Sequence, residues 1–328
     1  MWDKFIHSSP SLFDLLALAV CIGSLSCRVW VLRDKCDGME VREGPSVLGN
    51  LWTLLGVSVA MLVLSSLIIL IARSSEMSGL PVGESLAAIP RVVFDTHFGS
   101  VWMIRTTAVA VLCLGWWAGR RDLQNLRSSI LMLTAALAIA ATRSASSHAA
   151  DAGDFSLNEI ADWLHLLAAS VWGGGLIALS AAVFPSVLRN TGKRLSYFTE
   201  IVVRFSGLAG VALFIVLITA VYQGWTEVGS FKALVGTVYG KIIILKITLA
   251  LVLIMLAVSN RYISIPRLLE LSVSGKDNDR TISRLVLKVR AEALIIAAIL
   301  VCTAFLIHST PAKHSFHPGH EHAHGISK

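Results

Sequence analysis

Histidine is the residue type that points most directly to chemistry in this sequence, because it is the commonest metal ligand among side chains. The chain has ten histidines, and five of them lie within eleven residues near the C-terminus, in "HSFHPGHEHAHGISK". A purification tag is usually an unbroken run, whereas these histidines are two or three residues apart. The segment is too polar and too interrupted to fold alone. We therefore expect a flexible metal-binding tail over residues 311–328, with His314, His317, His320, His322 and His324 as its ligands.

A second kind of candidate ligand is His165, which lies inside an apolar stretch with the sequence "DWLHLLAASVWGGG". Asp162 precedes it by three residues, so the two side chains share one face of a helix. A carboxylate one turn away can fix the tautomer of a histidine, as the outer partners of metal-bound histidines do. This pattern favours a metal ligand that Asp162 supports. The alternative is a histidine that bonds a neighbouring helix and serves packing.

Membrane-spanning helices must position these residues. The chain is 55% hydrophobic and 15% charged, with a mean hydropathy of +0.71, whereas a soluble domain has about 25% charged residues. Eight apolar runs of about 20 residues are each long enough for a helix to cross the hydrocarbon, and they do not alternate as barrel strands do. We predict an all-α polytopic bundle with spans at about 11–32, 51–72, 99–119, 128–147, 158–183, 202–222, 240–260 and 291–309.

The basic residues predict which way these spans face. Of the 28 Lys and Arg residues, 18 lie in or beside the connections that follow the first, third, fifth and seventh spans. Connections rich in Lys and Arg stay in the cytoplasm, so both termini are predicted to point outward. The net charge of +7 then reflects contact with the membrane surface, and nothing in it suggests a nucleic acid partner.

This orientation places all ten histidines on the outer face or in the outer part of the bundle. Few methionines lie on that side, and a set dominated by histidine suits Cu(II), Zn or Ni better than Cu(I). The residues alone leave the choice among these metals open. We expect the histidines outside the tail to converge at the outer mouth of the bundle, where the ligands would be His97, His148, His165 and His308.

The two halves of the sequence resemble each other weakly. The third predicted span opens with "THFGSVWMIR" and the seventh with "TVYGKIIILK", which share a threonine, an aromatic residue, a glycine and a basic residue at the same spacing. We predict two four-span halves of the same orientation, over residues 1–150 and 151–310. Convergence of helix ends is the alternative.

Four charged residues inside the predicted spans follow this repeat, because Asp14 matches Asp162 and Arg105 matches Lys246. All four lie at a shallow depth below the outer helix ends. A charge within a span usually faces the bundle interior and has a partner there. We predict that these residues pair across the outer third of the bundle, and the alternative is that the basic side chains extend to the outer headgroups.

Motifs for two enzyme classes are missing. The sequence contains neither a GxxxxGK[ST] phosphate-binding loop nor an HExxH zinc-protease motif, so ATP-driven pumping and zinc proteolysis have no support. We expect a protein that is not an enzyme.

Several longer strings resemble a known family. "DWLHLLAASVWGGGLIAL", "VVRFSGLAG", "TVYGKIIILKITLALVLIMLAVSNR" and "VRAEAL" are similar to the copper resistance protein D family of bacterial inner-membrane proteins, most clearly over about 155–308. The resemblance implies copper as the metal, movement of copper from periplasm toward cytoplasm, and a periplasmic copper-binding partner. The family motif carries over to Trp163, His165, Trp172 and Gly174, and the histidine tail is no part of it.

Three functions remain open at this point. The first is copper transport, in which outer histidines capture the ion and His165 passes it inward. The second is a redox protein that binds haem b, since paired histidines on facing helices also hold haem, with the charged residues near the mouth serving quinone or propionate groups. The third is a non-transporting protein for copper delivery or assembly.

Overall fold

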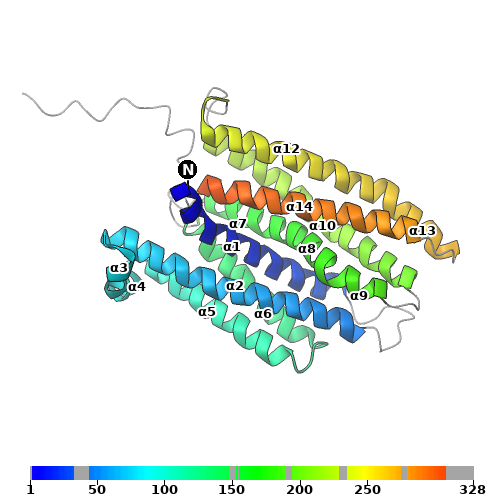
Figure 1. Cartoon of the computed structure of the whole chain (residues 1–328), viewed down its shortest axis with the longest axis horizontal. Coiled ribbons are helices and arrows are strands. Elements are labelled where there is room, and N and C mark those ends of the chain that lie inside the picture. The colour runs from blue at the N-terminus through cyan, green and yellow to red at the C-terminus, as the bar shows by residue number, and fades with distance from the viewer. Residues whose placement is uncertain are drawn as a thin grey trace, which may run out of the picture.

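The fold is a bundle of long helices. The computed structural model describes residues 2–32, 44–147, 153, 155–189, 194–228, 235–274 and 279–307. Within these ranges every regular element is helical, and the long helices run roughly side by side (Figure 1). The predicted all-α polytopic bundle is confirmed, and nothing is described for the histidine tail.

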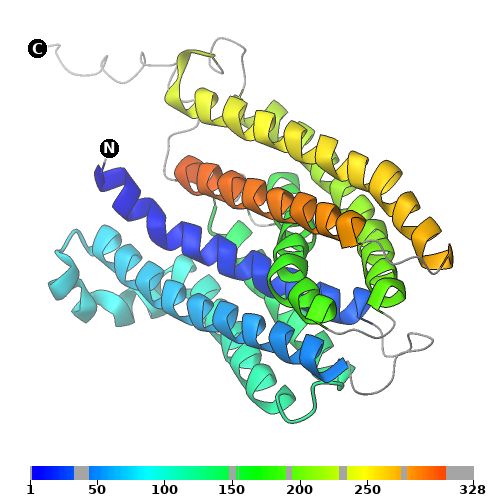
Figure 2. The ribbon, with the colours of Figure 1, turned by 45° about the vertical axis from the view of Figure 1, so that its right-hand side comes forward.

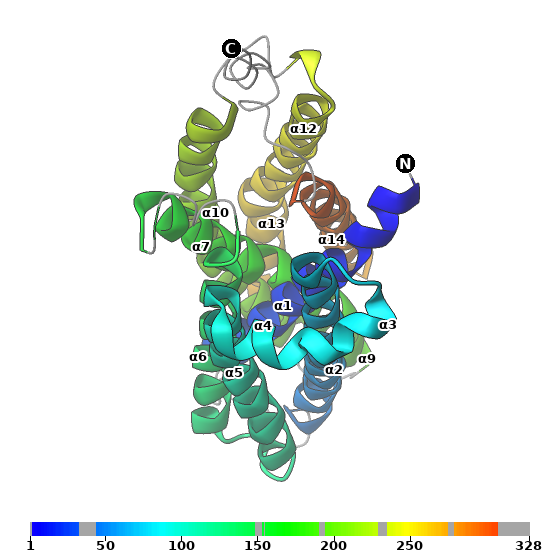
Figure 3. The same cartoon turned by 90° about the vertical axis from the view of Figure 1, so that its left-hand side faces the viewer.

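The first half of the chain contributes four long helices and a set of short ones. The short helices lie across one end of the bundle, against α2 and α5 (Figure 3). In chain order the elements are α1 (Trp2–Ser26), the π-helical segment η1 (Cys27–Val31), α2 (Gly44–Ser78), α3 (Val82–Ser85), the 3₁₀ turn η2 (Leu86–Ala88), α4 (Ile89–Asp95), α5 (His97–Gly119) and α6 (Leu126–Ser144).

The second half contains three long helical runs and one uninterrupted run of short segments. Figure 2 shows α14 lying between α1 and α12, and both of these helices contact it. The elements are α7 (Leu157–Ala169), η4 (Ser170–Gly174), α8 (Gly175–Ala178), η5 (Leu179–Val183), α9 (Phe184–Arg189), α10 (Arg194–Val228), α12 (Val238–Ser259), η6 (Asn260–Ser264), α13 (Ile265–Ser274) and α14 (Asp279–Ile307), of which η4, η5 and η6 are π-helical.

Seven helical segments among the described residues are long and apolar enough to cross a membrane, and each overlaps one of the first seven predicted spans. The eighth predicted span, 291–309, falls on α14 as far as Ile307. This helix has 29 residues but is not one of the seven, and residues 308 and 309 lie outside the described ranges. The seven segments are Pro10–Val31, Val47–Ser78, His97–Gly119, Leu126–Ser144, Leu157–Arg189, Leu195–Thr226 and Val238–Ser274.

The threonine–glycine motif repeated in the sequence starts two helices in the same way. The side chain of Thr96 accepts a hydrogen bond from the backbone N–H of Gly99 at 3.0 Å, and Thr237 accepts one from Gly240 at 2.9 Å. A threonine at this position satisfies one of the backbone N–H groups that the first turn of a helix leaves unpaired. The repeat is therefore a helix-start motif at α5 and α12, and the division into two halves stays a prediction.

The polypeptide backbones of the two halves touch where α1 crosses η4. A Cβ atom added to Gly23 would lie 2.1 Å from the carbonyl carbon of Gly174, and one added to Gly174 would lie 1.8 Å from the carbonyl oxygen of Ala19. Glycine at these two positions lets the helices approach this closely, as small residues do between membrane helices. The glycine-rich end of "DWLHLLAASVWGGG" thus fixes α7 and its extension against the central helix α1.

Candidate functional site

His165 lies at the contact between α7 and α10. Helix α7 starts at Leu157, after Ser156 caps the N–H of Glu159 at 3.3 Å. His165 is therefore eight residues, or about 12 Å, along this helix. Its side chain is partly buried, and its Nδ1 lies 2.9 Å from the Oγ1 atom of Thr219 in α10.

The hydrogen bonds of Thr219 favour one tautomer of His165. The Thr219 hydroxyl is 2.7 Å from the carbonyl oxygen of Ile215 and 3.1 Å from that of Val216. A hydroxyl has one hydrogen, and when it is directed to either carbonyl the oxygen can accept a hydrogen bond from Nδ1–H of His165. In the neutral ring Nε2 then carries the lone pair, and this is the form of histidine that binds a metal.

Asp162 differs from what the sequence suggested for it. Its carboxylate accepts hydrogen bonds from the hydroxyls of Ser144 at 2.8 Å and Ser147 at 3.4 Å, and the amide of Gln223 lies at 3.5 Å. The reason is geometric, because the C-terminal end of α6 lies beside the start of α7. Asp162 therefore joins α7 to α6. The residue that bonds Nδ1 of His165 is Thr219, and not Asp162 as the sequence suggested.

The two other supporting residues, Lys246 and Trp163, lie on different sides of α7. Lys246 of α12 lies close enough to His165 to interact with it electrostatically. Trp163 points the other way, because its indole N–H donates to the carbonyl of Leu137 in α6 at 3.3 Å. Trp163 is thus a second link between α7 and α6.

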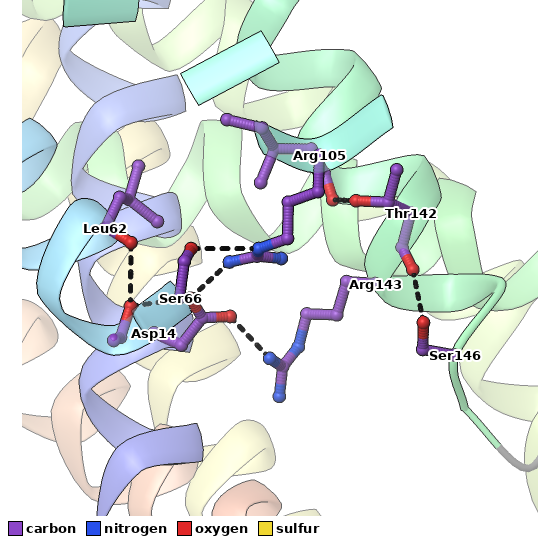
Figure 4. A network of polar contacts seen from close by, with 9 residues as sticks. Asp14, Leu62, Ser66, Arg105, Thr142, Arg143 and Ser146 are labelled. Carbon is purple, nitrogen blue, oxygen red and sulfur yellow. Dashed lines mark hydrogen bonds and ion pairs between the residues drawn. The ribbon is translucent and has the colours of Figure 1, made fainter. Parts of the chain in front are cut away.

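The strongest polar contacts of the first half centre on Asp14 of α1, which has no exposed surface (Figure 4). Its Oδ1 accepts hydrogen bonds from Nη2 of Arg105 at 2.5 Å and from the hydroxyl of Ser65 at 2.8 Å. Its Oδ2 accepts one from Nη1 of Arg143 at 2.6 Å. The Nε–H of Arg105 donates to the hydroxyl of Ser66 at 3.0 Å. One carboxylate thus joins α1, α2, α5 and α6.

This Asp14 cluster is unsuited to hold a metal cation. It contains one carboxylate and two guanidinium groups, so its formal charge is positive, and both carboxylate oxygens are occupied. Sequence reasoning predicted pairing among Asp14, Asp162, Arg105 and Lys246, and the structure brings Asp14 and Arg105 together. It did not identify Arg143, although a basic residue inside the fourth predicted span was a signal for a buried partner.

Of the other predicted histidine ligands, His97 is the one that the structure describes. His97 is the first residue of α5 and is exposed. Within the ranges that the structure describes, no group of three or more His, Cys, Asp or Glu side chains lies close enough to hold a metal ion. The convergence of histidines at the outer mouth stays a prediction, because the remaining ones lie outside the described residues: His148, His308, His314, His317, His320, His322 and His324.

A second buried polar cluster lies at the C-terminal end of α12, where η6 meets α14. Glu292 of α14 is 3% exposed, and its Oε1 accepts a hydrogen bond from the amide of Asn260 at 2.6 Å. Lys288 donates to the hydroxyls of Ser259 at 3.1 Å and Ser264 at 3.0 Å. These contacts bind the π-helical segment η6 to α14.

Comparisons with known proteins agree with a copper-related membrane protein. A family model described as copper resistance protein D matches residues 199–306, and one described as copper resistance protein D-like, N-terminal domain, matches residues 11–157. His165 lies between the two matched segments. No solved structure matches the chain.

Two relatives are similar along much of this chain. The copper transport protein CutJ of Bacillus subtilis (strain 168) is 27% identical over 236 residues, which are 70% of this chain and 41% of that protein. The inner membrane protein YebZ of Escherichia coli (strain K12) is 24% identical over 216 residues, 66% of this chain and 70% of that protein. The chain thus spans less than half the length of the Bacillus relative.

Proposed function

The chain belongs to the copper resistance protein D family, and we propose that it moves copper ions across the membrane that its helices span, with His165 as a ligand inside the bundle. The relative named as a copper transport protein supports transport. The predicted orientation places the candidate histidine ligands on the outer side, so we propose that copper moves from that side inward.

The observation that carries this proposal is the bond between His165 and Thr219. It supports a neutral imidazole whose Nε2 is free of hydrogen, on a residue partly buried within a helix that can cross the membrane. Side chains that hold the tautomer of a metal-binding histidine typically change metal affinity 10- to 100-fold when they are replaced. Thr219 is therefore a positioning residue in this account.

Copper affinity measured by competition with a chelator tests the proposal. The chain is truncated after Pro311 so that the tail histidines do not dominate the signal. We expect His165→Ala to weaken copper binding at least 10-fold and Thr219→Val to weaken it about 10-fold. Thr219→Ser keeps the hydroxyl and is the matched control, expected to bind as the truncated parent does. Equal affinity of His165→Ala and the parent would remove His165 from the path.

The optical spectrum of the same samples separates copper from haem. A Soret band in the purified protein that is lost in His165→Ala would assign this histidine to haem b. Copper binding without such a band is the outcome that we expect.

We also propose that the protein lies in a bacterial inner membrane, with both termini in the periplasm. The family and the relative named as an inner membrane protein support this location, and the Lys and Arg distribution supports the orientation. A periplasmic copper-binding protein would then deliver the ion to the outer histidines. Reporter fusions after residues 123 and 311 test the orientation, with activity of a periplasm-dependent reporter expected only at the second position.

A further inference from the structure

A preformed groove lies between α2 and α5, away from His165. Its volume is about 490 Å³, within the range of about 300–1,000 Å³ typical of ligand pockets. The walls are apolar or small, with Trp52, Val57 and Ala60 on α2 and Trp116 on α5, and Arg120 lies at one end. The open side of the groove is accessible from the surface of the bundle, since Val57 and Ala60 are exposed.

The two tryptophans give this groove a fixed shape. The indole N–H of Trp52 donates to the carbonyl of Trp116 at 3.2 Å, and that of Trp116 donates to the carbonyl of Trp52 at 3.1 Å. A Cβ atom on Gly56 would lie 2.7 Å from the Trp116 ring, so this glycine lets the indole lie directly against α2. These reciprocal bonds join α2 to α5 along the groove.

The length of the groove matches one leaflet of a bilayer. Its lining on α2 extends from Gly49 to Ala60, which is about 16 Å at 1.5 Å per residue. The hydrocarbon core of a bilayer is about 30 Å thick, so the groove runs through about half of it. An occupant with one extended acyl chain fits this depth.

The charge at the polar end indicates which headgroup the occupant carries. The exposed guanidinium of Arg120 stacks on Trp116, with 6.0 Å to the ring centroid, and on Trp117, with 5.4 Å. Arg121 stacks on Trp117 at 5.0 Å, and over residues 120–127 the three arginines outnumber the single acidic residue, Asp122. Basic residues next to a membrane helix attract anionic lipids. A zwitterionic headgroup would instead bring its positively charged amine next to these arginines, which repel it.

We propose that this groove binds one anionic phospholipid, with an acyl chain along α2 beside Trp116 and the phosphate on Arg120. The predicted orientation assigns the lipid to the cytoplasmic leaflet. Copper binding at His165 is independent of this site, so each proposal can fail without the other.

Native mass spectrometry of the purified full chain tests this site with two probes, phosphatidylglycerol and phosphatidylcholine. We expect the parent to retain phosphatidylglycerol preferentially. Arg120→Gln should lower that preference about fivefold, the effect of one basic residue near a membrane surface. Ala60→Phe fills the groove without changing the charge and should reduce binding of both lipids. Arg127→Gln, in the first turn of α6 and outside the groove lining, is the matched control and should leave both unchanged.

Three outcomes would overturn the proposal. Equal effects of Arg127→Gln and Arg120→Gln would show diffuse attraction to basic residues without a defined site. Equal lipid retention in the parent and the three variants would mean that the bound lipid is an adventitious additive only. A dimer in the parent that Ala60→Phe converts to a monomer would show that a second copy of the chain occupies the groove.

Discussion

Replacing Asp14 by asparagine should destabilise the bundle strongly, and more than replacing Asp162 by asparagine. In the native protein the carboxylate contacts two guanidinium groups, at 2.5 and 2.6 Å, and one hydroxyl at 2.8 Å. Asparagine has one acceptor oxygen, so one guanidinium loses its partner and faces an N–H group. The formal charge of the cluster also rises from +1 to +2.

The magnitude follows from the burial of the three side chains. Breaking a buried ion pair by removing one partner costs about 3–5 kcal/mol. The side chain of Asp14 has no exposed area, but those of Arg105 and Arg143 are 10% and 15% exposed, so water can partly solvate the guanidinium groups. We therefore expect a loss of about 3 kcal/mol in the free energy of unfolding.

The free energy of unfolding can be measured by titrating the purified protein in mixed micelles with SDS and following circular dichroism. Asp162→Asn is the matched control, because hydroxyl and amide donors surround that carboxylate and an amide oxygen can accept from them. We expect it to cost less than about 1 kcal/mol. In an Arg143→Met background, Asp14→Asn should cost less than in the parent, because only Arg105 then needs an acceptor. Equal losses for Asp14→Asn and Asp162→Asn would refute the account of the cluster.

Two further predictions concern the backbone. Gly174→Ala should lower the free energy of unfolding by about 1–3 kcal/mol, because its Cβ would lie 1.8 Å from the carbonyl oxygen of Ala19. The control is Gly207→Ala, where a Cβ meets nothing within 4 Å; it should be neutral or slightly stabilising in the same titration. Thr96→Ala removes the cap on Gly99 and should cost about 1 kcal/mol, while Thr96→Ser should retain most of the stability; equal losses for both would mean that the hydroxyl does not stabilise the helix start.

The helices could be predicted from the sequence better than their ends. Apolar composition over 20 residues is enough to identify a span, and the first seven predicted spans each overlap an observed segment. The predicted spans 51–72 and 202–222 end six residues before α2 and α10 do, because those helices continue through polar residues to Ser78 and Val228. Hydropathy reports the hydrocarbon boundary, and backbone hydrogen bonding continues past it.

The polar contacts could be predicted only where a charge needed a partner at its own depth. Asp14 and Arg105 satisfied that condition. The contact between His165 and Thr219 could not be predicted, because a threonine in an apolar helix usually bonds only its own backbone, as Thr219 also does. The bond of Asp162 to Ser144 depends on how the end of α6 meets α7, and residue spacing within one helix does not contain that information.

Copper uptake into sealed vesicles tests the central claim most directly. The vesicles contain the parent chain, the chain truncated after Pro311, or His165→Ala, at equal amounts of folded protein. The account predicts that uptake by His165→Ala falls to the level of empty vesicles, and that the truncated chain retains uptake at saturating copper with a weaker dependence at low copper. Uptake by His165→Ala equal to that of the parent would contradict it.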